Sequence, residues 1–216
     1  MRLAKPSIKF LWMTENPLKI IEAAGRTCYK SEDRITDSSA ISFVKRLIDR
    51  GHFAMIVAMI EHASASYKIV CDRGVLHEIV RHRLFSYAQE STRYCNYKGG
   101  VEFIVPCWFE DDFETRFYLD IEDGWPEEEN EWVNVMEMCE ESYLTLLHCG
   151  WTPQQARSVL PNSLKTEIVV TGNLREWLHF FSLRCAKSAH PQMQEVANML
   201  LMDIKERVQV IFDETI

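Results

Sequence analysis

Several features of membrane and secreted proteins are missing from this sequence of 216 residues. It has no apolar run that approaches the roughly 18 residues a membrane-spanning helix needs. Its first residues, Met1 to Pro6, lack the apolar core of a signal peptide. We therefore expect a cytoplasmic protein with no membrane partner.

The usual metal, disulfide and nucleotide motifs are also missing. The seven cysteines are an odd number, scattered along the chain without a C-x-x-C pair, which argues against a disulfide framework or a zinc ribbon. No H-E-x-x-H motif occurs, so we expect no metal. The eight glycines form neither a G-x-G-x-x-G nor a Walker loop. A nucleotide cofactor would therefore be held by side chains from several segments.

The net charge of −8 is unevenly distributed. Residues 110–141 hold fourteen acids and a single base, Arg116, so the rest of the chain carries a net positive charge. An acidic total argues against a nucleic-acid partner, which needs a broad basic face. A basic remainder suits small anions such as nucleotides. The acidic block itself is most simply a solvated helical surface.

Apolar periodicity predicts helices separated by a few strands. We expect strands over 64–71, 101–105 and 164–170. Among the helices, one over 127–148 has a core stripe of Trp132, Val135, Met136, Cys139, Tyr143, Leu146 and Leu147. Asn173 is a good N-cap for a helix over 174–184, since Glu176 follows it by three residues. Further helices begin near residues 17, 39, 75, 153 and 191. We predict one α+β domain spanning residues 1–216, with a small mixed or antiparallel sheet wrapped by long helices.

Polar and basic residues are concentrated between Arg81 and Tyr94, where a predicted helix ends. The segment holds three arginines, a histidine, two serines, an amide, an acid and two tyrosines. Guanidinium groups match phosphate and carboxylate oxygens with two hydrogen bonds. A solvated basic turn is the simpler explanation of an isolated Arg-His-Arg. The longer pattern is far less common by chance.

Three ordered segments resemble the flavin-dependent thymidylate synthase family. The first is Arg81-His82-Arg83, seven residues, Ser91, and then Arg93-Tyr94. The others are residues 156–161, and residues 173–184 followed by 189–192. The resemblance implies an FAD-dependent methyltransferase that converts dUMP to dTMP. It further implies 5,10-methylenetetrahydrofolate as carbon donor, NADPH as reductant of FAD, and a homotetramer whose active sites are shared between subunits.

The resemblance also implies roles for individual residues. Catalysis falls to Arg184 and Ser91. The residues implied to bind dUMP are Glu78, Arg81, Gln89, Glu90, Ser91, Thr92, Arg93, Arg157 and Arg184. Those implied to bind FAD are Arg81, His82, Arg83, Gln89, Asn173, Leu174, Arg175 and His179.

The chemistry of the residues bears on these roles. A phosphate needs fixed cations, for which Arg93 and Arg157 are candidates, and a guanidinium at the ring edge would stabilise an ionised pyrimidine. Arg184 could equally complement the dipole of its helix, and His179 could be an ordinary packed histidine. Asn173 and Arg184 share a helix face but stand roughly 16 Å apart, so one small ring cannot touch both. Ser91 has no activating partner at a fixed spacing and is better suited to orient substrate.

Residues 54–60 depart from the family pattern, because Ala-Met-Ile occurs twice and about four residues look inserted. This insertion leaves the roles of His52 and Cys28 open, and Glu78 stands where some relatives have a glutamine. A non-catalytic nucleotide-binding regulator on the same fold is the alternative function. An RNA-binding module, a third class, would use only the Arg-His-Arg cluster.

Overall fold

The computed structural model describes residues 1–109, 112–118 and 126–213. Its strands are β1 Arg2–Ala4, β2 Ser7–Met13, β3 Ser64–Asp72, β4 Ser86–Gln89, β5 Glu102–Ile104 and β6 Lys165–Asn173. Its α-helices are α1 Pro17–Tyr29, α2 Ser39–Asp49, α3 Phe53–Met59, α4 Arg73–Ile79, α5 Phe113–Tyr118, α6 Glu127–His148, α7 Pro153–Ala156, α8 Leu174–Arg184, α9 Pro191–Arg207 and α10 Gln209–Phe212. Short 3₁₀ helices are η1 Glu32–Arg34, η2 Ile60–His62 and η3 Arg157–Val159. Within these residues, no helix is long and apolar enough to cross a membrane.

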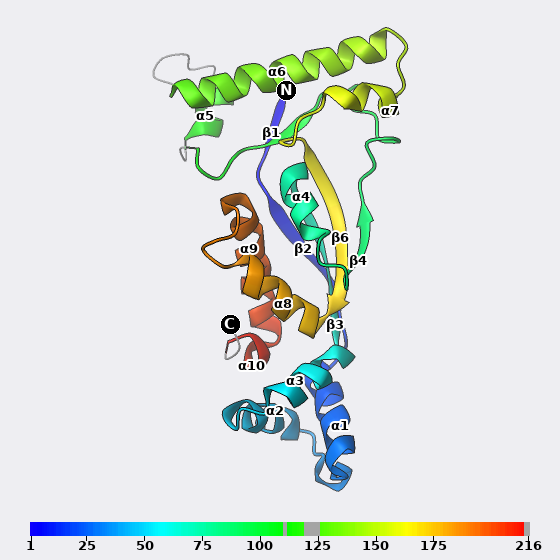
Figure 1. Ribbon diagram of the computed structural model, residues 1–216, viewed down its shortest axis with the longest axis vertical. Coiled ribbons are helices and arrows are strands. Elements are labelled where there is room, and N and C mark those ends of the chain that lie inside the picture. Colours follow the sequence, from blue (N-terminus) through cyan, green and yellow to red (C-terminus); the bar gives the residue numbers. More distant parts are fainter. Residues whose placement is uncertain (110–111, 119–125, 214–216) are drawn as a thin grey trace. The chain divides into compact units, whose positions relative to one another are not determined.

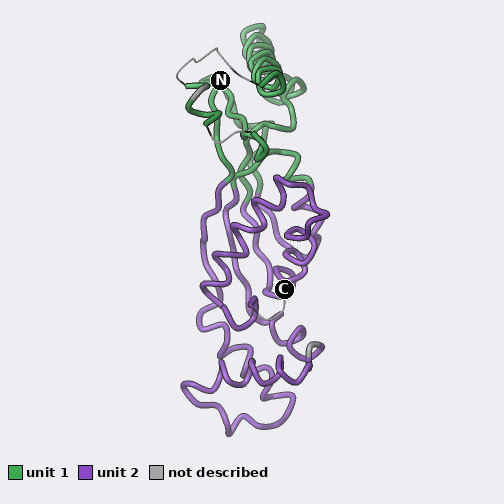
Figure 2. The backbone as a smooth tube through the Cα atoms, turned by 90° about the vertical axis from the view of Figure 1, so that its left-hand side faces the viewer, with its two compact units in different colours: residues 1–6, 70–77, 89–168 green, residues 7–69, 78–88, 169–216 purple. Residues whose placement is uncertain are grey.

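The chain forms two compact units, each built from several segments (Figure 2). Unit 1 contains residues 1–6, 70–77 and 89–168, and unit 2 contains residues 7–69, 78–88 and 169–216. The chain passes from one unit to the other between Pro6 and Ser7, and again within β3, α4, β4 and β6.

Four strands pair in the order β2-β3-β6-β4 (Figure 1). In unit 2, the N–H of Thr14, just after β2, donates to the carbonyl of Ser64 at the start of β3. Leu174, just after β6, likewise donates to the carbonyl of Ala63. Both bonds join the end of one strand to the start of its neighbour, the antiparallel arrangement. The sheet confirms the predicted fold class.

Helices α8 and α9 pack against each other, and α8 buries Trp177, Phe180 and Phe181 in the core of unit 2. Trp177 of α8 lies edge-on to Tyr67 of β3 at 5.4 Å between ring centroids, and its Nε1–H donates to the Ala65 carbonyl at 3.2 Å. The Tyr67 hydroxyl donates to Asp203 of α9 at 2.7 Å. These contacts fix α8 on the sheet, and α8 carries four predicted site residues, Leu174, Arg175, His179 and Arg184.

Unit 1 is built around α6 and the parallel pair β1–β5. Two apolar clusters fill it. The first contains Val101, Phe103, Met136, Tyr143, Ala156 and Leu164, and the second contains Leu3, Val105, Phe113 and Val133. Ala156 is fully buried and anchors the short helix α7 beneath α6. That anchor positions Arg157, the next residue.

Most predicted elements are confirmed, with local corrections. Helix α6 has the predicted bounds, and Ala65, Tyr67, Ile69 and Cys71 point inward from β3 as predicted. The prediction for Val135 was wrong: its side chain is 40 % exposed, and Val133 is buried in its place. Glu129 is buried as well, although the acidic block was expected to be solvated. Residues 110–111 and 119–125 of that block lie outside the described residues.

Candidate functional site

The turn after Arg81 is shaped by one aromatic side chain and one glycine. Phe85 is buried against Trp177, with 4.6 Å between ring centroids. It also lies against Gly172 of β6, where a Cβ atom would approach the Phe85 ring to 2.1 Å. The Tyr87 hydroxyl lies 2.7 Å from the carbonyl oxygens of both Ile79 and His82. Strand β6 therefore needs a glycine at this position for the Arg-His-Arg turn to dock.

Arg184, at the end of α8, is held by three hydrogen bonds within unit 2. Its Nη1 donates to Glu78 Oε2 at 2.7 Å, and its Nη2 donates to the Glu78 carbonyl at 3.1 Å. Its Nε donates to His82 Nε2 at 3.0 Å. The guanidinium is therefore fixed in one plane by α4 and the following turn. This arrangement goes beyond a helix-terminal arginine that only complements the dipole.

His82 is 5 % exposed and stays neutral at physiological pH. Burial, followed by the nearby charges of Arg184 and His179, lowers the pKa of His82 to about 4. Because His82 Nε2 accepts from Arg184, the imidazole proton lies on Nδ1, which is 3.6 Å from Glu176 Oε1. Burial raises the pKa of Glu176 above its ordinary value.

The side chains of His82, Glu176 and His179 place their ligand atoms within 4.8 Å of one another, close enough to hold a metal ion. The hydrogen bond from Arg184 opposes this use of His82. It occupies Nε2 and keeps the proton on Nδ1, the atom that faces Glu176. The prediction of no metal remains untested, and we interpret the cluster as a support for Arg184.

Three further arginines predicted to contact a cofactor lie on the surface of unit 2. Arg81 and Arg83 are exposed, and neither side chain pairs with any residue in the described part of the chain. Arg175, near the start of α8, pairs with Glu61. His179 is exposed on the same helix and lies edge-on to His82 at 5.6 Å between ring centroids. Arg81 and Arg83 are thus available to an external anion.

Asn173 and Leu174 have structural roles at the start of α8. The Asn173 side-chain oxygen accepts from the Glu176 N–H at 2.9 Å, as the capping pattern predicts. Leu174 is fully buried. The Asn173 side-chain amide nitrogen is not used by the cap.

In unit 1, Arg157 lines an open pocket of about 490 Å³. Its Nη1 donates to Thr92 Oγ1 at 3.1 Å. Arg73 lines the same pocket, and its buried Nη1 has no hydrogen-bond partner among the residues that the structure describes. The Arg73 N–H donates to the Asn162 carbonyl at 2.9 Å, which fixes the backbone of the Asp72-Arg73-Gly74 turn. Two guanidinium groups and a hydroxyl therefore line one pocket, a donor set that suits a phosphate.

The other predicted dUMP contacts follow β4 in unit 1. Gln89 is exposed, and Glu90 accepts from the Tyr97 hydroxyl at 2.6 Å. Ser91 Oγ accepts from the Arg93 backbone N–H at 3.3 Å. The Arg93 guanidinium lies over the Tyr94 ring at 5.4 Å and does not line the Arg157 pocket. The structure therefore groups Arg157 with Thr92 and Arg73, and places Arg93 outside that group.

Sequence reasoning missed Arg73 and Glu176. Arg73, just before the helix predicted to begin near residue 75, was given no role, although its charge and its place close to the Arg81–Tyr94 segment could have indicated one. Glu176 was interpreted only as part of a helix cap. Glu176 also faces His82, and this tertiary contact cannot be inferred from the periodicity of the helix.

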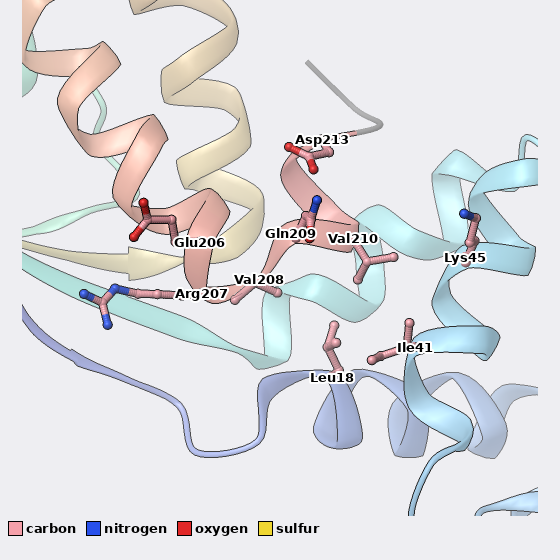
Figure 3. Close-up of a pocket in the computed structure, with 9 residues that line it drawn as sticks. All are labelled: Leu18, Ile41, Lys45, Glu206, Arg207, Val208, Gln209, Val210 and Asp213. Carbon is pink, nitrogen blue, oxygen red and sulfur yellow. The ribbon is translucent and has the colours of Figure 1, made fainter.

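A different cavity in unit 2, of about 440 Å³, lies between α1, α2 and the α9–α10 junction (Figure 3). Leu18, Ile41, Val208 and Val210 supply its apolar wall. None of the predicted site residues lines it. We assign it no role in the site.

Comparisons with known proteins agree with these motifs. The sequence model of the family described as Thymidylate synthase complementing protein matches residues 9–208. A protein of Mycobacterium bovis named flavin-dependent thymidylate synthase is 33 % identical over 215 residues, covering 97 % of this chain and 84 % of that protein. One of the same name from Corynebacterium efficiens is 34 % identical over 200 residues, covering 90 % and 78 %.

A solved structure supports the fold. The crystal structure of the UMP/dUMP methylase PolB from Streptomyces cacaoi, bound with 5-Br dUMP, superposes with a TM-score of 0.76 at 23 % identity. The match covers 99 % of this chain and 96 % of that chain. The family match over residues 9–208 and the relatives that are at least 33 % identical show that the chain belongs to the flavin-dependent thymidylate synthase family.

Proposed function

We propose that this protein is a thymidylate synthase that reductively methylates dUMP. One 5,10-methylenetetrahydrofolate supplies the carbon, and one NADPH and one proton supply the reducing equivalents, giving dTMP, tetrahydrofolate and NADP⁺. The observation that carries the proposal is the position of Arg184. Its guanidinium is fixed by Glu78 and by His82, the histidine of the Arg-His-Arg segment. A cation held this rigidly acts on developing charge without reorganising.

The phosphate of dUMP would bind in the unit 1 pocket of Arg73, Thr92 and Arg157. The unpartnered Nη1 of Arg73 supports this assignment, because a buried donor without an acceptor costs about 1–3 kcal/mol until an anion satisfies it. We propose that Ser91 orients the substrate, with Gln89, Glu90 and Arg93 lining its path.

Arg184 would stabilise the ionised pyrimidine. Its charge is partly balanced by Glu78, whose Oε2 lies 2.7 Å from Nη1. We propose that Glu78 turns toward a sugar hydroxyl when substrate binds, which frees one edge of the guanidinium. The neutral His82 continues to hold Nε, so the plane of Arg184 is preserved.

The residues of unit 2 fit a dinucleotide such as FAD. Arg81 and Arg83 are exposed cations on either side of His82, unpaired within the described residues and suited to a pyrophosphate. Arg175 and His179 add two polar groups on α8. FAD reduced by NADPH would supply hydride. The residues of this chain contribute binding and orientation: Asn173 offers its amide nitrogen, and His82 supports both Arg184 and the turn.

We propose a homotetramer whose active sites draw residues from more than one subunit, located in the cytoplasm. A domain of this size with a small sheet cannot easily enclose FAD, dUMP and a folate alone. The Arg157 pocket and the Arg184 cluster of one active site would then come from different subunits.

The second candidate is a nucleotide-binding regulator without turnover. It is favoured by one observation, the Ala-Met-Ile repeat, which departs from the family pattern and falls in α3 and the start of η2. A regulator would bind dUMP through Arg157 and fail to form dTMP.

The test is the visible absorption spectrum of the purified protein with added FAD, recorded anaerobically before and after NADPH. We expect a flavin band that bleaches with NADPH, and dTMP formation once dUMP and the folate are supplied. A protein that keeps no flavin band once unbound FAD has been removed by gel filtration, yet binds dUMP, would support the regulator instead.

A further inference from the structure

A basic pocket in unit 2 lies outside every role assigned above. It has a volume of about 520 Å³ and is lined by residues of α1, the segment after it, and α2. Five cations and one acid, Asp33, line it, together with His52. The cations are Arg26, Lys30, Arg34, Arg46 and Arg50. Its size falls in the range of small-molecule sites, about 300–1,000 Å³.

Three of these cations have no bonding partner among the described residues. Lys30, Arg34 and Arg50 are exposed, and none makes a side-chain hydrogen bond or ion pair within the described part of the chain. Arg26 differs, because it is 6 % exposed and neutralised by Glu22 through two hydrogen bonds of 3.1 and 3.0 Å. The free positive charge therefore lies at the rim of the pocket.

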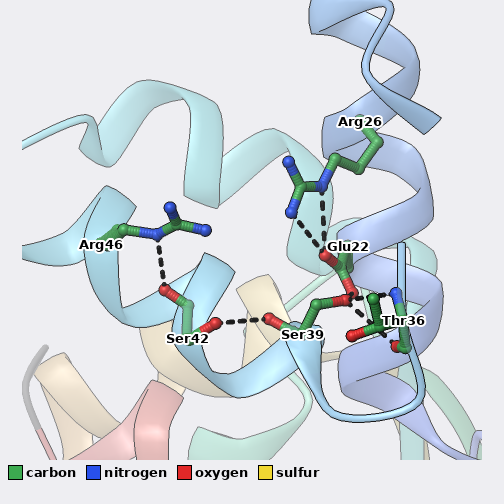
Figure 4. A network of polar contacts seen from close by, with 6 residues as sticks. All are labelled: Glu22, Arg26, Thr36, Ser39, Ser42 and Arg46. Atoms are coloured by element: carbon green, nitrogen blue, oxygen red, sulfur yellow. Dashed lines mark hydrogen bonds and ion pairs between the residues drawn. The ribbon is translucent and has the colours of Figure 1, made fainter. Parts of the chain in front are cut away.

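Two of the lining arginines, Arg26 and Arg46, belong to a polar network (Figure 4). Glu22 accepts from Arg26 and, at 2.7 Å, from the hydroxyl of Ser39. The Ser42 hydroxyl donates to the Ser39 carbonyl, and Arg46 Nε donates to the Ser42 carbonyl at 3.1 Å. The network links α1 to α2, so the pocket has a defined shape before any anion arrives.

Aromatic and imidazole groups also line the pocket. The Tyr29 hydroxyl lies 3.5 Å from His52 Nδ1 and 2.8 Å from Met55 Sδ. The Arg26 guanidinium lies over the Phe43 ring at 4.6 Å. The pocket therefore combines apolar surface with several separate cations.

We propose that this pocket binds an oligo-γ-glutamate chain, the flexible tail of carboxylates that a folate can carry. The proposal rests on the proposed function, which supplies the folate. Guanidinium groups pair with carboxylates in forks, and three separate cations on long flexible stems match charges repeated along a chain. Compact phosphate sites instead use converging backbone N–H groups in glycine-rich turns, and no glycine lines this pocket.

Binding of fluorescein-labelled penta-γ-glutamate to the intact protein, followed by anisotropy, tests the pocket directly. Replacing Arg34→Ala and Arg50→Ala together should weaken binding at least tenfold, about 1.4 kcal/mol. The matched control is Lys9→Ala with Lys98→Ala, which removes two exposed charges elsewhere and should change the dissociation constant less than twofold. Equal losses in both double variants, or no binding at all, would overturn the proposal.

A second readout separates this site from the catalytic one. The KM for methylenetetrahydrofolate should be at least tenfold lower with five glutamates than with one, and the Arg34/Arg50 double variant should lose that advantage. A protein without synthase activity would refute the proposed function, while the anisotropy measurement would still decide the pocket. If adenosine 2′,5′-bisphosphate displaced the labelled peptide and penta-γ-glutamate itself did not, the pocket would be a phosphate site and the proposal wrong.

Discussion

Arg184→Lys separates the charge of this residue from its geometry. Lysine keeps the positive charge but is a point donor, whereas the arginine uses three nitrogens at once. The lysine ammonium can replace the bond to Glu78. It cannot also reach His82 Nε2 and the Glu78 carbonyl from one position.

The magnitude follows from those lost bonds. Losing a preorganised donor to a developing anion typically costs about 2.7–4 kcal/mol, or 10²–10³ in kcat. The Arg184 side chain is 19 % exposed, so the two acceptors left unpaired cost a smaller amount of stability, about 1–2 kcal/mol. We therefore expect kcat to fall at least 100-fold while the protein remains folded.

The assay is steady-state dTMP formation at saturating dUMP, with flavin content measured in the same sample. Arg184→Gln, which removes the charge, is the companion variant and should be at least as impaired. If Arg184→Lys kept more than a third of the activity with normal flavin content, charge alone would suffice. The positioning of Arg184 by Glu78 and His82 would then have no catalytic role.

Three further predictions concern the phosphate pocket, His82 and Gly172. Arg157→Ala should raise the KM for dUMP about tenfold to 100-fold with little change in kcat, because a charge-assisted contact contributes about 1.5–3 kcal/mol; an unchanged KM would remove Arg157 from the phosphate site. The folded-state pKa of His82, about 4, lies below its ordinary value of 6.5, so the unfolded chain binds the proton first and stability falls as pH drops from 6.5 to 4. Between pH 6.5 and 4, the free energy of unfolding measured in urea should fall by up to about 3 kcal/mol more in the wild type than in His82→Gln. Equal decreases in the two proteins would contradict the pKa assigned to His82. Gly172→Ala should cost about 1–3 kcal/mol, since its Cβ would approach the Phe85 ring to 2.1 Å, whereas Gly99→Ala, with open space around it, should be nearly neutral in the same unfolding measurement.

Local signals predicted the helices best. Helix α6 has acids in its first turn and a clear apolar period, and Asn173 caps α8 through the bond that its spacing indicates. Val135 was assigned to the core because it borders the apolar stripe of the helix. Val133 borders the stripe on the other side, and only tertiary packing decides which of the two is buried. The sequence therefore predicted the helix but not every residue of its buried face.

Strands β1, β2 and β4 were not predicted, and for β2 and β4 the reason is the exposure of their side chains. The β2 segment Ser-Ile-Lys-Phe-Leu-Trp-Met carries Leu11 and Trp12 exposed side by side, which breaks the alternation of a half-buried strand. Strand β4 has four residues, three of them exposed, and lies within a segment that shows no period.

The candidate site was predicted in part. Motif order identified the basic segments and the family, but the bonds of Arg184 to Glu78 and His82 connect residues far apart in sequence. Arg73 lies at the site because its backbone N–H bonds to the Asn162 carbonyl, a contact between residues far apart in sequence. The residue roles assigned to both clusters remain predictions.

A single-turnover experiment tests the central claim most directly. The protein is loaded with FAD, reduced anaerobically by NADPH, and then mixed with dUMP and methylenetetrahydrofolate labelled at its methylene carbon. We predict that label appears in dTMP in an amount equal to the flavin reoxidised. Flavin that stays reduced while no labelled dTMP forms would contradict the account.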